Sequence, residues 1–151
     1  TARLAVPCAN LFAKDLSALA LSGAAQDIAF KVILVSDRYQ SAAQAFPSRA
    51  QQRPVLAAVA AGKITHGLQA QGVAQAVIAA FVTAPPDPDL VTLAQSGALG
   101  HALLNTVALT DAGGKGDINQ LVTGLATLRA LGFEDVARRV GLQVLLLGKL
   151  S

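Results

Sequence analysis

Residues 117–147 read DINQLVTGLATLRALGFEDVARRVGLQVLLL, and this stretch decides the fold. Asp117 can cap a helix, and Gln120 stands three residues later, as in a capping box. The helix that follows has apolar residues at the i, i+3, i+4, i+7 spacing of one helix face: Ile118, Leu121, Val122, Leu125 and Leu128. Gly132 is placed to take the left-handed conformation that often ends a helix. The sequence therefore predicts a helix that starts after Asp117 and stops at Gly132.

A second helix is predicted from Phe133. Glu134 and Asp135 would lie in its first turn, where the helix dipole favours carboxylates. Its inner stripe comprises Val136, Val140, Val144 and Leu147. Gly141 is small enough to let a partner helix approach. Because the connection is so short, the two helices are predicted to pack as an antiparallel hairpin.

The preceding segment follows the same pattern. Asp87 can cap a helix whose first position is Pro88, where the missing N–H costs nothing. This helix would turn at Ser96-Gly97 into a longer one that reaches Thr110. Further helices are predicted over residues 24–46 and from 48 or 54 to 61. Residues 67–70 lead into another, which runs through Val73, Val77, Ile78 and Phe81. The predicted fold is therefore all-α: antiparallel helical hairpins in a bundle or a short solenoid-like array of about seven helices, forming one helical domain over residues 1–151.

An α/β fold is the alternative. Residues 31–37, 76–83 and 106–111 resemble buried parallel strands, and such strands would carry ligand contacts at their carboxyl ends. However, residues 25–29 and 98–105 run into the first and third of these segments without a turn residue. A parallel sheet needs a turn between each helix and the next strand, so the all-α fold is favoured.

The chain carries few charges for a protein with so many predicted helices. Only 14% of its 151 residues are charged and 53% are hydrophobic, whereas about 25% are charged in typical soluble domains. Glu134 is the only glutamate, so the Glu–Lys pairs that normally cover exposed helix faces are almost absent. We therefore expect a protein partner or self-association, through an interaction surface that comprises Val55, Val59, Val73, Val77 and Phe81.

Several classes of function are disfavoured. The longest uncharged apolar runs are shorter than the roughly 20 residues that a membrane-spanning helix needs. Nucleic-acid binding is not expected, because the net charge is only +3, the basic residues are scattered, and one Tyr, five Phe and no Trp leave little for base stacking. Cys8 alone can form neither an intrachain disulfide nor a thiolate zinc site. We expect a soluble cytoplasmic or periplasmic protein, and the absence of Met suggests a processed product or the C-terminal part of a longer chain.

Few residues suggest chemistry. The loop Gly113-Gly114-Lys115-Gly116 precedes a helix and could hold an anion, but it lacks the Walker spacing and reads as a flexible linker. His66 and His101 are 35 residues apart with no metal-ligand spacing. No catalytic, cofactor or metal residues are therefore predicted. The best candidate ligand site is the polar cluster Asp37-Arg38-Tyr39, with Lys115 as a further candidate; in the α/β alternative these residues would serve an enzyme or a small-ligand-binding domain.

The C-terminal hairpin also resembles a known family. Its pattern Leu125-x-x-Leu128-Arg129-Ala130-Leu131-Gly132-Phe133-x-x-Val136-Ala137-Arg138-Arg139 is similar to the helix–turn–helix units of α-solenoid proteins of the tetratricopeptide type. The resemblance covers residues 117–148, and no 34-residue period emerges along the chain. It implies stacked antiparallel helix pairs that present a surface to a protein or peptide, and no catalytic residues. The sequence thus predicts a structural or protein-interaction module without catalytic activity of its own.

Overall fold

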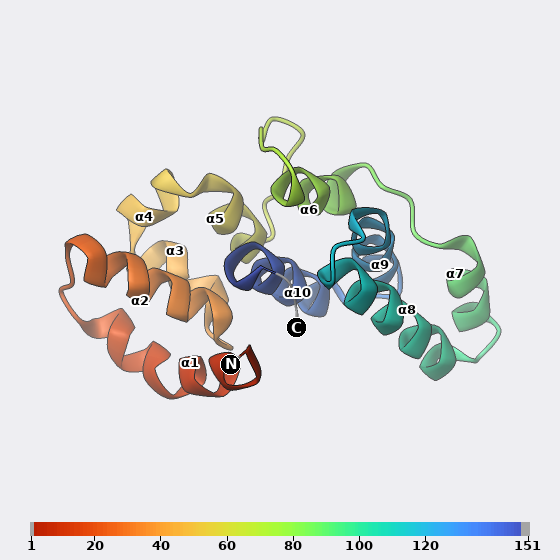
Figure 1. Ribbon diagram of the computed structural model, residues 1–151, viewed down its shortest axis with the longest axis horizontal. Coiled ribbons are helices and arrows are strands. Elements are labelled where there is room, and N and C mark those ends of the chain that lie inside the picture. Colours follow the sequence, from red (N-terminus) through yellow and green to blue (C-terminus); the bar gives the residue numbers. More distant parts are fainter. Residues whose placement is uncertain (1, 149–151) are drawn as a thin grey trace. The chain divides into compact units, whose positions relative to one another are not determined.

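A computed structural model describes residues 2–148, and these residues form helices and no strand (Figure 1). The predicted all-α class is confirmed, with ten α-helices in this range instead of about seven. The α/β alternative is wrong for the described residues, since none of its three proposed strands forms: residues 31–35, 76–82 and 106–111 are helical. The chain divides into two compact units, residues 1–63 and residues 64–151. The assignment of residues 1–151 to a single domain stays a prediction.

The first unit is built on a hairpin of two long helices. These are α1 (Ala2–Ala18) and α2 (Gly23–Val35), which pack against each other. Short helical segments follow: the 3₁₀ turn η1 (Tyr39–Ser41), α3 (Ala42–Ala45), α4 (Pro47–Gln52) and α5 (Pro54–Ala61). Proline occupies the first position of both α4 and α5, where its missing N–H costs nothing.

The helix predicted over residues 24–46 is interrupted, and this prediction is wrong at Ser36. The buried Ser36 hydroxyl donates to the Ile33 carbonyl at 2.7 Å and accepts from the Arg38 N–H at 3.1 Å. Asn10, on α1, accepts from the Asp37 N–H and donates to the Asp37 carboxylate, both at 2.8 Å. These side-chain hydrogen bonds compete with the backbone hydrogen bonds that would continue the helix, so α2 ends at Val35.

A group of charged side chains joins α2 to the segment around α4. Asp27 accepts from Lys31 at 2.7 Å and from Arg53 at 2.9 Å. Arg49 donates to the Gly23 carbonyl at 2.7 Å and to the Gln26 side chain at 3.2 Å. The hydrogen bond from Lys31 lowers the pKa of Asp27; partial burial opposes this, and Arg53 lowers the pKa further.

The second unit consists of five helices, of which the last four pack as consecutive hairpins and the first packs against α9. They are α6 (Val73–Val82), α7 (Pro88–Gln95), α8 (Leu99–Gly114), α9 (Ile118–Ala130) and α10 (Glu134–Leu147). Helix α8 packs against α7 and α9, while α9 also contacts α6 and α10 (Figure 1). The core of this unit lies around α9, whose buried residues include Leu121, Leu125 and Leu128.

The predicted caps of the second unit are confirmed. The Asp87 carboxylate accepts from the backbone N–H groups of Asp89 at 3.0 Å and Leu90 at 3.1 Å. Asp117 accepts from the Gln120 N–H at 3.1 Å and from the Gln120 side chain at 2.9 Å. The Asp87 N–H in turn donates to the Thr127 hydroxyl on α9 at 2.9 Å. The start of α7 is therefore fixed to α9.

Two glycines allow α8 and α9 to approach closely. A Cβ added at Gly124 would lie 2.6 Å from the Thr110 methyl carbon, and one added at Gly113 would lie 2.5 Å from the Leu121 backbone nitrogen. Gly113 and Gly114 are buried in the last turn of α8, so the flexible linker predicted for residues 113–116 is wrong at these two positions. Their helical state follows from packing against α9, since glycine weakens a helix that has no such contact.

Candidate functional site

The polar cluster Asp37-Arg38-Tyr39 lies in the turn between α2 and η1. Tyr39 is only 1% exposed, and its hydroxyl accepts from the Gln40 side chain at 3.2 Å. Asp37 is exposed and bonded to Asn10, while the exposed Arg38 uses its carbonyl to accept from the Ser41 hydroxyl at 2.8 Å. The exposed aspartate thus helps to end α2, and the buried tyrosine belongs to the core. A ligand site here stays a prediction.

Lys115 lies in the second unit, at the end of α8. Its ammonium group pairs with Asp111, one helical turn earlier, at 2.6 Å, and both side chains are more than half exposed. Such an exposed i,i+4 pair contributes only a few tenths of a kcal/mol. Lys115 is therefore an end-of-helix cation that also suits the α8 dipole.

The side chains predicted to form an interaction surface mostly fill the interior. Val59 and Val77 are fully buried, and Phe81 is nearly so. Val55 is half-buried, and Val73 is the only one of these five side chains that is exposed. Most of these side chains are therefore covered by other parts of the chain, and their role as an interaction surface stays a prediction.

A different apolar surface remains uncovered on α8. Leu104 is 72% exposed and Val107 is 55% exposed, and the small residues Gly100 and Ala108 beside them are exposed too. The opposite side of α8 carries the buried residues that face its neighbours: Ala102, Thr106, Thr110, Gly113 and Gly114. We call the exposed side, residues 100, 101, 104, 107, 108 and 111, the outer face of α8.

One feature of the sequence indicates this exposed face, although hydrophobic periodicity does not reveal it. Residues 99–110 contain no charged side chain, so the helix is apolar around most of its circumference. Such a helix is normally covered on all sides. Here the other helices of the second unit leave one side open. Exposed apolar side chains also occur in the first unit, on α1, on α2 and in the turn between them: Leu11, Phe12, Leu19 and Ile28.

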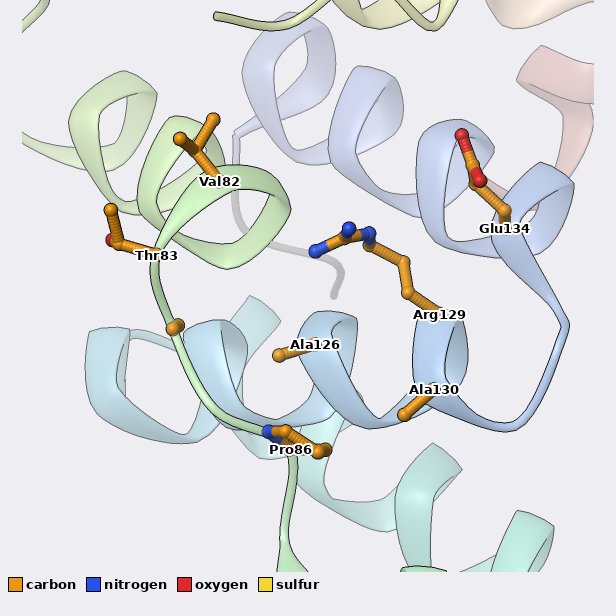
Figure 2. Close-up of a pocket in the computed structure, with 8 residues that line it drawn as sticks. Val82, Thr83, Pro86, Ala126, Arg129, Ala130 and Glu134 are labelled. Atoms are coloured by element: carbon orange, nitrogen blue, oxygen red, sulfur yellow. The ribbon is translucent and has the colours of Figure 1, made fainter. Parts of the chain in front are cut away.

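The second unit also has a pocket of about 340 Å³ beside Arg129 (Figure 2). The guanidinium group donates to the Ala80 carbonyl at 2.7 Å and lies over the Phe81 ring, 5.3 Å from its centroid. It thereby satisfies a carbonyl near the end of α6, one of the groups that a helix terminus leaves without an intrahelical partner. Glu134, on the wall of the pocket, would repel an anion. Arg129 therefore has a structural role in joining α9 to α6.

Two further pockets are formed within single units. One of about 270 Å³ is lined by apolar and glycine residues where α6, α8, α9 and α10 meet. The other, of about 400 Å³, lies in the first unit beside Gln40, Gln44 and Lys63. Within residues 2–148, no three His, Cys, Asp or Glu side chains gather where they could hold a metal ion.

The helices in the described part of the chain are too short or too polar to cross a membrane. No protein-family model, curated protein or solved structure matches this chain. The fold and the exposed surfaces therefore carry the functional argument.

Proposed function

We propose that this protein is a non-catalytic interaction module that binds a protein through the outer face of α8. In this proposal its helical hairpins act as a scaffold, in the manner of the α-solenoid proteins that residues 117–148 resemble. The observation that carries the proposal is the exposure of Leu104 and Val107 on a helix that has no charge from residue 99 to residue 110.

Burial of this face would contribute favourable free energy to a contact with another protein. Full burial of a leucine or valine side chain contributes about 1.5–3 kcal/mol. Leu104 and Val107 retain more than half of their exposure, and Gly100 and Ala108 let another surface approach the helix closely. The low overall charge supports the same conclusion, since few like charges would oppose association. The site of the α/β enzyme considered from the sequence depended on a sheet, and residues 2–148 form none.

Site-specific photo-crosslinking tests the proposal. A photoreactive phenylalanine analogue replaces Leu104 in one variant and the exposed Gln95 of α7 in a control. We expect a discrete protein adduct from position 104, in cells that express the protein, and none from position 95. The proposal is wrong if position 104 gives no more adduct than position 95 while circular dichroism shows both variants folded.

A further inference from the structure

The outer face of α8 has the spacing of a helix–helix seam. His101, Leu104, Ala108, Asp111 and Lys115 are all exposed. They are separated alternately by three and four residues, which is the heptad spacing of a and d positions. At 1.5 Å per residue, the stripe from residue 101 to residue 115 is about 21 Å long. A single straight helix could therefore pack along it.

The stripe is complementary to itself about its centre. Thr106 marks the midpoint: His101 and Asp111 each lie five residues from it, and Leu104 and Ala108 each lie two residues from it. When two copies of α8 run antiparallel, His101 therefore meets an aspartate and Leu104 meets an alanine. An imidazole, which can donate a hydrogen bond, faces a carboxylate, and a large side chain faces a small one.

We propose that a second copy of this chain docks its α8 antiparallel on the outer face of α8. The inference rests on the proposed function and specifies the partner. Because the pair is symmetric, each contact forms twice: His101 faces Asp111 of the partner subunit, and Leu104 faces Ala108 of the partner subunit. In this pair the Asp111 carboxylate accepts hydrogen bonds from two side chains. One is His101 of the partner subunit, and the other is Lys115 of its own helix, one turn further on at 2.6 Å.

The same residues disfavour a parallel pair. In parallel register each residue faces its own counterpart, so two Asp111 carboxylates would meet and two Leu104 side chains would crowd one layer. Like charges placed opposite each other destabilise an interface. The antiparallel register removes both conflicts and produces a closed two-fold dimer.

The predicted dimer is weak and depends on concentration. One seam of two heptads buries less than the roughly 800 Å² per partner of a standard interface. We therefore expect monomers at low micromolar concentration and dimers at hundreds of micromolar. Association this weak suits a contact that forms where many copies gather.

Sedimentation velocity tests the proposal, with two variants matched for exposure. Leu104 and Leu11 are 72% and 73% exposed on helices of different units. We expect Leu104→Glu to weaken dimerisation at least tenfold, because it places a charge in the seam twice. Leu11→Glu makes the same chemical change outside the seam and should leave the dissociation constant within about twofold of the wild-type value.

A charge exchange tests the antiparallel register. His101→Asp places two aspartates opposite each other at both ends of the seam, and Asp111→Lys places a lysine opposite His101. Each single variant should dimerise more weakly than the wild type. The double variant H101D/D111K should recover most of the loss, because each aspartate then faces a lysine of the partner subunit. Circular dichroism confirms that every variant is folded.

Three results would overturn the inference. The first is a wild-type chain that stays monomeric at several hundred micromolar, as would happen if another part of the same chain covered α8. The second is a dimer that Leu11→Glu disrupts and Leu104→Glu does not. The third is a double variant no stronger than its parents. If the wild type is monomeric but position 104 still crosslinks to another protein, the inference fails and the proposed function stands; if crosslinking fails as well, both fail.

Discussion

Replacement of Gly113 by alanine is the sharpest test of the close approach between α8 and α9. The added methyl carbon would lie 2.5 Å from the Leu121 nitrogen and 2.6 Å from the Leu121 Cβ, and closer still to the Leu121 Cα. Carbon atoms pack best at about 3.5–4.0 Å, so α9 would have to move by about 1 Å. The obstacle is backbone, which cannot rotate away as the end of a side chain can.

The net effect is the difference between two opposing contributions. Overpacking of a core typically costs about 1–3 kcal/mol. Replacement of glycine by alanine within a helix stabilises the fold by about 0.5–1 kcal/mol. Since the contact here is with rigid backbone, we expect a net loss of about 2 kcal/mol. For a chain of this size that loss lowers the Tm by about 4–8 °C.

Gly100 provides the matched control in the same helix. A Cβ added there meets no atom within 4 Å, so Gly100→Ala should keep or slightly raise stability. Urea and thermal unfolding of both variants, followed by circular dichroism, measure the difference. A Gly113→Ala variant as stable as Gly100→Ala would refute the close packing of α8 on Leu121.

Three other outcomes can be checked by urea unfolding. The lowered pKa of Asp27 means that its ion pairs stabilise the fold fully at pH values above the unfolded pKa, near 3.8, and that this contribution disappears as the pH falls through the lower folded pKa. Asp27→Asn should therefore remove this part of the pH dependence of the unfolding free energy. An unchanged pH profile would count against the Lys31 and Arg53 contacts. Asp87→Ala should cost about 1 kcal/mol as a lost cap, whereas Asp89→Ala, which removes a carboxylate that accepts neither capping bond, should cost less; equal losses would show that the cap is unimportant. Leu125→Ala should cost about 2–5 kcal/mol, because this fully buried side chain leaves a cavity, and a loss below 1 kcal/mol would mean that α9 is not central to the core.

Local signals made the hairpins of residues 87–147 predictable. The caps at Asp87 and Asp117 and the left-handed Gly132 depend on neighbours within one helical turn, and all three occur as expected. The end of α2 depends instead on Asn10, which is 27 residues away from Asp37. Periodicity over residues 24–46 cannot detect such a contact, so the sequence suggested one continuous helix.

The exposed surface was harder to predict than the fold. Val77 and Leu104 both lie on strongly apolar helices, yet the first is fully buried and the second is largely exposed. Hydrophobic periodicity identifies an apolar face but does not say whether another helix covers it. That information depends on which helices meet, and a helix that is apolar around most of its circumference, such as α8, gives no preferred direction.

The hydrogen bond from the Asp87 N–H to the Thr127 hydroxyl has a consequence for how this chain can vary. The connection between α6 and α7 is anchored at its far end by α9, 40 residues onward. Extra residues inserted among 84–86 would lengthen a surface loop at small entropic cost, and α7 would still begin at the same place. The connection before Asp87 is thus a natural point for insertion of a peptide tag, while α8 would keep its outer face unchanged.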